Sequence, residues 1–330
     1  MGEQMKEERR RLLAKVAYLH YVQGKSQTLI SKEMNIYRTT VCRMLAKAKE
    51  EGIVRIEIAD YDADLFALEE YVRKQYGLEK LDLVPNQVED TPADTLTNVS
   101  KTAAEVVRHT VKDGDKIGLS WGATLSSVID GLDPKAMKDI LIYPLAGGPS
   151  HINAKYHVNT LIYRLAHIFH GNSAFINAMV IQEDKQLTKG IIQSKYFESI
   201  LASWDQLDLA LVGIGGEPNS REESQWRDLL TDADYAQLKQ EEAVGEVCCR
   251  FFDQAGHPVY KDLQDRTIGI SLEQLGRVPK TIAVATGKYK AKAILAALKA
   301  GVINYLVTDK ETMLAVLALD ENIDLNNVLL

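Results

Sequence analysis

The sequence predicts an α/β protein in two parts, an N-terminal helix-turn-helix followed by a doubly wound α/β domain. Three observations lead to this fold class. Residues 26–52 have the pattern of two helices separated by a short turn. From residue 78 onward, apolar runs of four to eight residues alternate with helical stretches, which is typical of a parallel sheet covered by helices. Basic residues gather near the N-terminus, where residues 1–58 contain 12 Lys and Arg against 7 Asp and Glu.

The first sixty residues contain three expected helices. An amphipathic helix is predicted over 7–23. Ser26 is a suitable N-cap for a short second helix, and the turn after it begins at Asn35. The third helix, over 37–51, has the clearest pattern, because its apolar residues recur at i, i+3, i+4 and i+7. These residues are Val41, Met44, Leu45 and Ala48.

The exposed face of the third helix carries side chains that suit double-stranded DNA: Tyr37, Arg38, Thr39, Thr40, Arg43 and Lys47. The major groove admits one α-helix, and the N-terminal residues of that helix reach base edges. The net charge of −7 divides into +5 for residues 1–58 and −12 for the rest, as expected when only one part meets phosphates. Charge by itself favours a solvated helical face over a DNA-binding one. The DNA-binding hypothesis therefore rests on the charge and the helix pair together.

The region after the third helix predicts a short strand over 53–61, because apolar and polar residues alternate there. This strand would make the unit a winged or extended helix-turn-helix. A helix is then expected over 62–76. We accordingly predict a DNA-binding domain over 1–58, a helical connector over 59–77, and a large α/β domain over 78–330.

Eight strands are expected in the α/β domain, and each is a short apolar run. They are 81–85, 116–121, 139–145, 173–178, 207–214, 247–252, 281–286 and 304–309. Helical stretches fall between most of them, so the strands should be parallel and the sheet covered on both faces.

Composition limits the class of protein. With 46% hydrophobic and 26% charged residues, the 330-residue chain is typical of a soluble protein with ample core. It has no signal peptide and no uninterrupted apolar stretch of 18 residues, so we expect a cytoplasmic protein with no membrane partner. Cys42, Cys248 and Cys249 lack metal-ligand spacing and fit a reducing compartment. The adjacent pair is expected inside the buried strand at 247–252, with redox activity as the alternative.

Four predicted strands end in loops rich in small residues, at 118–124, 144–150, 212–220 and 284–290. In open α/β sheets, ligands bind outside the carboxyl ends of the strands. Glycines let backbone N–H groups approach an anion, and a following helix adds its positive end. The loops therefore predict a small anionic ligand, held by Ser120, Gly122, Thr124, Gly287, Lys288 and Lys290. Each loop taken singly is also compatible with a plain tight turn, since none carries a specific nucleotide-binding motif.

Two further groups of polar residues have competing interpretations. Asp253 follows a predicted strand, where its carboxylate could accept hydrogen bonds from sugar hydroxyls or cap the turn before Gly256. His167 and His170 have the i, i+3 spacing of metal ligands. No carboxylate stands beside these histidines, so solvated or core-edge side chains are expected. We predict no metal and no cofactor.

Several motifs occur together and in order: GDKIGLSWGATL, LALVGIGG, GEVCCRFFDQAGHPVY and AVATGKYKAKAILAALKAGVINYLVTD. With the helix-turn-helix, they resemble the SorC family of bacterial sugar-responsive transcriptional regulators over nearly the whole chain. IYRTTVCRML and YHVNTLIYRLA resemble the sorbose/sorbitol branch in particular. The resemblance implies a homotetramer, as a dimer of dimers, whose effector domain is related in fold to phosphosugar isomerases and deaminases. It also implies a sugar or sugar phosphate as the effector.

The resemblance assigns roles to several residues. GLSWGAT and ATGKYK would hold the phosphate or polar end of the ligand. Lys290 occupies the lysine of the family pattern GGxxK, and Asp253 occupies the aspartate of FFDxxG. Glycines would line the pocket floor, namely Gly147, Gly148, Gly213, Gly215 and Gly216. The sequence departs from the pattern at Thr286, where the usual residue is glycine. A threonine there would change which head group fits, or would simply add a donor.

Three functions are compatible with the sequence. The first is a ligand-controlled DNA-binding protein, which we favour. The second is an enzyme acting on a sugar phosphate, which needs a base and a ring-opening group. Its candidates are Asp253, Glu217, His257 and Lys290, but no His–carboxylate signature stands out, and a shared fold does not imply catalysis. The third is an interaction module with a vestigial pocket. We expect the protein not to be an enzyme.

Overall fold

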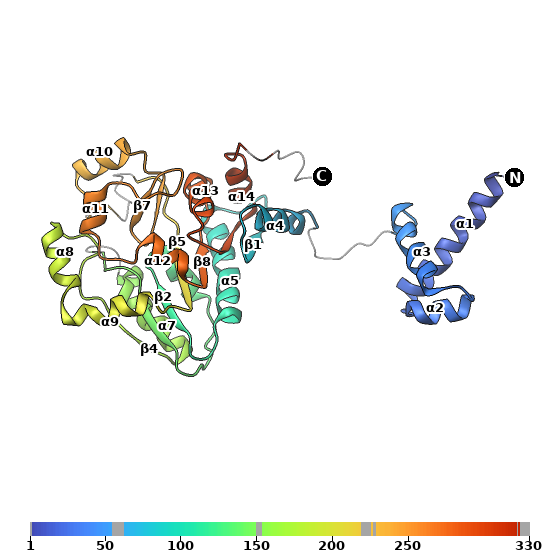
Figure 1. The fold of residues 1–330 in the computed structure, drawn as a ribbon, viewed down its shortest axis with the longest axis horizontal. Helices are drawn as coiled ribbons and strands as arrows, with labels where there is room; N and C mark the ends of the chain where they lie inside the picture. The colour runs from blue at the N-terminus through green and yellow to red at the C-terminus, as the bar shows by residue number, and fades with distance from the viewer. Residues whose placement is uncertain are drawn as a thin grey trace. The chain divides into compact units, whose positions relative to one another are not determined.

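The computed structural model describes residues 2–54, 63–149, 154–218, 226, 229–321 and 323. The chain divides into two compact units, Met1–Asp62 and Ala63–Leu330 (Figure 1).

The N-terminal unit contains the three helices that the sequence predicts. They are α1 (Gly2–Ala17, prolonged by a π-helical turn over Tyr18–Val22), α2 (Gln27–Met34) and α3 (Arg38–Glu50). Ser26 caps α2 as predicted, because its hydroxyl oxygen accepts the N–H of Leu29 at 3.3 Å. Asn35 ends α2 in the left-handed region with φ 51°, a conformation that asparagine adopts more readily than most residues.

The core of this unit is small and entirely apolar. Its buried side chains come from all three helices and are Leu13, Val16, Ala17, Ile30, Val41, Leu45 and Ala48. Helix α3 therefore turns one face toward α1 and α2 and leaves the opposite face in solvent, as its predicted periodicity requires. Residues 55–61 of the predicted strand lie outside the described residues.

The second unit is built on a parallel sheet of seven strands in the order β1-β9-β8-β5-β2-β3-β4. All six neighbouring pairs are parallel, which confirms the predicted sheet type. The strands are β1 (Lys80–Val84), β2 (Lys116–Leu119), β3 (Leu141–Pro144), β4 (Asn172–Ser173), β5 (Leu209–Gly213), β8 (Lys280–Val284) and β9 (Tyr305–Asp309).

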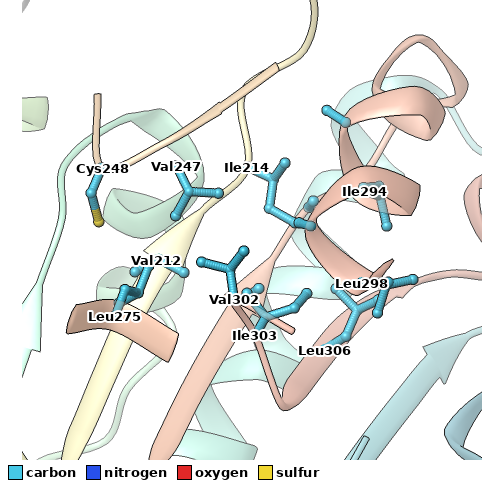
Figure 2. Packing of buried hydrophobic residues seen from close by; sticks show 14 of the residues in the cluster. Val212, Ile214, Val247, Cys248, Leu275, Ile294, Leu298, Val302, Ile303 and Leu306 are labelled. Atoms are coloured by element: carbon cyan, nitrogen blue, oxygen red, sulfur yellow. The ribbon is translucent and has the colours of Figure 1, made fainter. Parts of the chain in front are cut away.

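Two apolar clusters lie against the sheet, because successive residues of a strand point to opposite faces. In β5, Leu209 and Leu211 belong to one cluster, while Ala210 and Val212 belong to the other. Figure 2 shows part of the cluster that contains Val212. Helices that share the cluster of Leu209 are α5 (Pro92–Thr110), α6 (Ala123–Asp130), α7 (Val158–Phe169), α10 (Asp232–Gln240) and α11 (Lys261–Arg266).

Helices that share the cluster of Val212 are α4 (Ala63–Gln75), α9 (Lys195–Trp204), α12 (Leu272–Arg277), α13 (Ala291–Lys299) and α14 (Lys310–Leu317). Helix α8 (Lys185–Ile192) adds the partly buried Ile191 and Ile192 to the same cluster. The sheet is therefore covered by helices on both faces.

Two strand predictions were wrong. The run 247–252 is not one strand but an antiparallel hairpin of β6 (Gly245–Val247) and β7 (Arg250–Phe252), outside the main sheet. Cys248 and Cys249 form its two-residue turn with φ 51° and 66°. Positive φ at both turn residues matches the twist of a hairpin, although glycine or asparagine usually provides it. Each cysteine is buried in a different apolar cluster, so the two side chains diverge. Figure 2 shows Cys248 in the cluster of Val212.

The strand predicted at 173–178 is limited to Asn172–Ser173 at the edge of the sheet. A side chain takes the place of a neighbouring strand beyond this point. The Asn159 amide accepts the N–H of Ile176 at 3.3 Å and donates to its carbonyl oxygen at 3.1 Å. The backbone is thus satisfied without extending the ladder.

The predicted connector over 59–77 also needs correction. Its helix exists as α4, but it is part of the second unit, which begins at Ala63. Leu68 and Val72 are completely buried in the same cluster as Leu81 of β1 and Met313 of α14. Burial of two large apolar side chains stabilises this docking by about 3–5 kcal/mol.

Candidate ligand cavity and nucleic-acid interface

A cavity of about 1240 Å³ lies at the carboxyl ends of five strands of the α/β unit. Residues that follow β1, β2, β5, β8 and β9 line it. The chain passes from β2 outward to β3 and β4, and then returns to β5 on the other side of β2. Loops after β2 and β5 therefore diverge, and such a reversal of strand order is where open α/β sheets bind ligands.

Nine of the twelve residues predicted to bind the effector line this cavity. They are Ser120, Gly122, Thr124, Gly213, Gly215, Gly216, Gly287, Lys288 and Lys290. The other three, Gly147, Gly148 and Asp253, are not among the lining residues. A side chain at Gly147 would meet the backbone of Met179, and one at Gly148 would meet the ring of His157. These two glycines therefore allow close packing of neighbouring segments.

Asp253 has the capping arrangement that the sequence left as its alternative role. Its Oδ1 accepts the N–H groups of Ala255 and His257, each at 2.9 Å. These bonds close the turn in which Gly256 has φ 80°. His257, another catalytic candidate, is likewise absent from the cavity lining, whereas Glu217 and Lys290 are present there.

The loop after β2 presents an open helix N-terminus to the cavity. Gly122 precedes α6 with φ 127° and provides no side-chain cap. Ala123, Thr124 and Leu125, the first three residues of α6, line the cavity. The first N–H groups of a helix have no partner within it, and the helix dipole adds positive potential at this end. This end of the cavity is suited to an anion.

The loop after β8 uses its polar groups internally. The N–H of Gly287 donates to Thr312 Oγ1 at 2.8 Å, and the Thr312 hydroxyl donates to Asp309 Oδ2 at 2.6 Å. The Thr286 hydroxyl donates to the same Asp309 oxygen at 2.6 Å. Asn86 Nδ2 donates to Asp309 Oδ1 at 3.2 Å. The Gly287 amide, expected to approach an anion, therefore already has a partner.

This cluster also explains the departure from the family pattern at Thr286. Its hydroxyl serves the buried carboxylate of Asp309. Burial acts to raise the pKa of Asp309, but the hydrogen bonds from Thr286, Thr312 and Asn86 outweigh it and hold the pKa below its usual value. Asp309 is thus an ionised group that ties three loops together.

The two lysines of the β8 loop differ in their surroundings. Lys288 is exposed and pairs with Glu311 at 2.9 Å. Lys290 is partly buried, lies with its Nζ 5.8 Å from the centre of the Tyr289 ring, and forms no ion pair with the described residues. Burial lowers the pKa of Lys290, although the negative charge of Glu246 partly opposes this. An anionic ligand would restore its normal ionisation.

Glu246 is a buried carboxyl group in the wall of the cavity, with 6% of its surface exposed. Its Oε2 accepts the N–H of Cys249 at 2.9 Å, and a side chain at Gly215 would collide with its Oε1. Burial raises the pKa of Glu246 to about 7, against the lowering effects of the Cys249 N–H and of Lys290. Gly215 is therefore required by the packing of Glu246.

Sequence reasoning missed several lining residues. They are aromatic or acidic, and include Tyr156, Trp226, Glu246 and Asp309. Trp121 and Tyr289 also line the cavity, within the predicted motifs GLSWGAT and ATGKYK. The Trp121 and Trp226 rings lie 5.8 Å apart and form an apolar wall. Asp309 alone had a usable signal, because it ends an apolar run and precedes a helix, where Asp is a preferred cap.

In the N-terminal unit, the residues predicted to contact DNA lie on the solvent side of α3. Tyr37 precedes the helix and is 83% exposed. Arg38, Thr39, Thr40 and Arg43 are exposed as well. Lys47 is half-buried, with its Nζ 3.9 Å from Glu51 Oε1. A pairing this long and exposed contributes little, so the ammonium group can exchange it for a phosphate.

No group of three or more potential metal-ligating side chains comes together within the described ranges. In the same part of the chain, no helix has both the length and the apolar character needed to cross a membrane.

The second unit matches the family model described as "Putative sugar-binding domain" over residues 62–318. Two relatives are similar over nearly the whole chain. The "Sorbitol operon regulator" of Klebsiella pneumoniae is 33% identical over 305 residues, or 92% of this chain and 96% of the relative. The "Deoxyribonucleoside regulator" of Bacillus subtilis (strain 168) is 32% identical over 310 residues, or 93% of this chain and 97% of the relative.

Solved structures show the same likeness. A transcriptional regulator from Streptococcus pneumoniae TIGR4 has 48% sequence identity and a TM-score of 0.75, covering 78% of this chain and 98% of that chain. The full-length sorbitol operon regulator SorC from Klebsiella pneumoniae has 32% identity and a TM-score of 0.73, covering 93% of this chain and 99% of that chain.

Fold, cavity and likeness together define a class, that of transcriptional regulators with a sugar-binding α/β domain. The chain belongs to the SorC family of sugar-responsive transcriptional regulators, which confirms the predicted resemblance.

Proposed function

We propose that a sugar phosphate in the cavity of the α/β unit controls the binding of operator DNA by α3. One observation carries the choice of ligand: the open N-terminus of α6 and the unpaired charge of Lys290 line one cavity. Backbone N–H groups and a lysine are the usual partners of a phosphate. Ser120 and Thr124 add hydroxyl donors at the same end.

The sugar part of the ligand would contact the remaining walls. Glu246 can accept hydrogen bonds from hydroxyl groups, and the Trp121–Trp226 wall and Tyr289 can pack on the C–H groups of the sugar. The names of the two relatives, one of a sorbitol operon and one of deoxyribonucleosides, support a sugar-derived effector, and the first name supports one of the sorbose/sorbitol type.

The protein acts by binding and not by catalysis in this proposal. Asp253 and His257, two of the four catalytic candidates, do not line the cavity. Asp309 is occupied by hydrogen bonds from Thr286, Thr312 and Asn86, so it has no free position to act as a base.

On the DNA side, α3 is the helix of a helix-turn-helix that enters the major groove. Arg38, Thr39, Thr40 and Arg43 would lie near base edges and Lys47 near a phosphate. Two such units in a dimer would read half-sites spaced by helical turns, and we propose a homotetramer built as a dimer of dimers. The ligand would act through its different affinity for two subunit arrangements.

The effector is tested by a thermal-shift panel of sorbose, sorbitol and deoxyribose and their phosphates, with inorganic phosphate as the control. A ligand at 100 times its dissociation constant adds about 2.7 kcal/mol to stability. We expect a rise in Tm with one sugar phosphate and not with its free sugar. A response to the free sugar alone would contradict the phosphate contact, and no response to any compound would favour an interaction module.

The DNA-binding face is tested by Arg43→Ala. We expect operator binding to weaken by about 1–3 kcal/mol if Arg43 contacts a base. Operator fragments are first selected from a randomised pool with the wild-type chain, and affinities are then measured by fluorescence anisotropy. Arg277→Ala is the matched control, because Arg277 is an exposed arginine of the α/β unit paired with Glu273. Equal affinities of both variants would remove Arg43 from the proposed contact face.

A further inference from the structure

Helix α4 is held by two different elements of the α/β unit. The Glu69 carboxylate accepts the N–H of Leu83 in β1 at 2.7 Å. Farther along α4, just past its end, the Tyr76 hydroxyl donates to Asp320 Oδ2 at 2.7 Å. Asp320 follows α14, is 3% exposed, and also accepts Lys299 Nζ at 3.1 Å. In both contacts, a buried or half-buried carboxylate holds the α4 segment to a neighbouring element, β1 or the residues after α14.

The same two elements, β1 and α14, meet again at the cavity. Asp309 begins α14 as its N-cap, and Asn86 follows β1 by two residues. Asn86 Nδ2 donates to Asp309 Oδ1, and Asn86 Oδ1 accepts the N–H of Glu311 at 2.9 Å. The Thr286–Gly287 segment of the β8 loop joins this cluster through Asp309 and Thr312. Two rigid elements thus connect the cavity to α4.

Asn86, Thr286, Gly287, Asp309 and Thr312 form one hydrogen-bonded group, the Asp309 cluster. We propose that the Asp309 cluster and α4 form a mechanical relay between the effector cavity and the DNA-binding unit. The relay runs along α14 to Asp320 and along β1 to Leu83, and ends at Tyr76 and Glu69. It rests on the proposed function, because it concerns how the occupied cavity changes DNA binding.

Chain continuity makes α4 the endpoint of the relay. Residues 55–62 link the helical unit to Ala63, the first residue of α4. A shift of α4 therefore moves the anchor of that link. A ligand that draws Lys290 inward also moves Thr286 and Gly287, since these residues belong to one short loop. Coupling of this kind needs one element whose position depends on both sites. Helix α14 can be that element, because the Asp309 cluster lies at its start and the contacts of Asp320 with Tyr76 and Lys299 lie just past its end.

The relay is tested without a ligand, by hydrogen–deuterium exchange of the full-length chain. Thr286→Val removes the hydroxyl that donates to Asp309 and keeps the shape of the side chain. Thr267→Val is the matched control, because Thr267 is buried and donates to the Leu263 carbonyl oxygen at 2.7 Å outside the relay. We expect Thr286→Val to speed exchange of the α4 amides by about three- to tenfold and Thr267→Val to leave them unchanged. Faster exchange confined to residues 286–290 and 309–312 would overturn the relay.

A second measurement asks whether the relay reaches the DNA-binding unit. Tyr76→Phe removes only the hydroxyl bonded to Asp320. The control Tyr260→Phe removes a similar bond, to Asp234 Oδ1 at 2.8 Å, which joins residues outside the relay. We expect Tyr76→Phe to change the affinity for a selected DNA fragment by about threefold or more, with Tyr260→Phe at the wild-type value. Equal affinities would contradict the last step of the relay.

The two measurements separate the relay from the proposed function. If the wild-type chain selected no DNA from the pool, the proposed function would fail. The exchange of α4 in Thr286→Val would still decide whether the cavity and α4 are coupled.

Discussion

Two loops that face the cavity look alike in sequence and differ in chemistry. Each follows a parallel strand, contains a glycine with positive φ, and leads into a helix: Gly122 has φ 127° and Gly287 has φ 108°. After β2, no side chain caps the helix, and its N–H groups face the cavity. After β8, the Gly287 N–H is bonded to Thr312. The amides at the start of α6 are therefore available to an anion, whereas the Gly287 amide is not.

The difference comes from the neighbouring strand. β9 lies beside β8 and ends in Asp309, whose carboxylate organises the loop next to it. In the described part of the chain, the N-terminus of α6 after β2 has no side-chain cap. A glycine-rich loop after a strand therefore indicates a binding site only when its amides have no partner within the protein. The predictions that follow test this contrast, from the largest expected effect to the smallest.

Asp309→Asn should have the largest effect, on stability. The substitution replaces one of the two acceptor oxygens by an amide nitrogen. Whichever oxygen is lost, at least one of the groups that donate to it, on Thr286, Thr312 or Asn86, is left without an acceptor. We expect the free energy of unfolding to fall by about 2–4 kcal/mol. Urea denaturation followed by tryptophan fluorescence reports this unit, because all three tryptophans lie in it.

Asp253→Asn is the control for this comparison. Asp253 also accepts backbone N–H groups, but in a solvent-exposed turn, and we expect a loss of about 1 kcal/mol or less. An equal loss in both variants would show that the Asp309 cluster is no more important than a single turn cap.

Lys290→Met should separate binding from stability. We expect affinity for the sugar phosphate found in the panel to fall by about 2–3 kcal/mol, since a charge-assisted contact is lost. Stability without ligand should stay or rise, because burial already lowers the pKa of Lys290. Isothermal titration calorimetry measures the affinity. Lys288→Met, which removes the exposed partner of Glu311, should bind the sugar phosphate with wild-type affinity. An equal loss of affinity in both variants would mean that the positive charge of the loop matters, and not a contact of Lys290 with the ligand.

Glu246→Gln should change the dependence of stability on pH. The folded protein holds a proton on Glu246 up to about pH 7, whereas the unfolded chain releases it near pH 4.5. Its contribution is complete below pH 4.5 and is lost as pH rises toward 7. Between pH 5 and 8, the wild type should therefore lose about 2 kcal/mol more than Glu246→Gln. Urea denaturation at pH 5 and at pH 8 measures this difference, with Glu311→Gln as an exposed control. An equal change in unfolding free energy in the wild type and in Glu246→Gln would mean that another group titrates in this range.

Thr286→Gly restores the glycine of the family pattern and should have the smallest effect. The Asp309 carboxylate loses one donor but keeps Thr312 and Asn86, so we expect a loss of about 1 kcal/mol in unfolding free energy. Thr286→Ser keeps the hydroxyl and should remain within error of the wild type. A loss of equal size in Thr286→Ser would mean that the methyl group, and not the hydroxyl, carries the effect.

The sequence was most informative where structure is local. The predicted helices of the N-terminal unit are present, because their apolar spacing records which face is buried. Six of the eight predicted strands join one parallel sheet, and a seventh is shortened to Asn172–Ser173, because strands that alternate with helices can pair in few other ways. The β6–β7 hairpin was not predicted, because Cys248 and Cys249 adopt positive φ without the glycine or asparagine that normally indicates such a turn.

For the cavity, the sequence by itself determined its place, since the ends of parallel strands share one edge of the sheet. It also indicated nine of the residues that line it. Only the tertiary structure decided which of their polar groups remain available. Asn86, Thr286 and Asp309 lie far apart in the chain, and their hydrogen bonds exist only because β1, β9 and β8 are neighbours in the sheet. Partners of this kind depend on strand order, which no local pattern records.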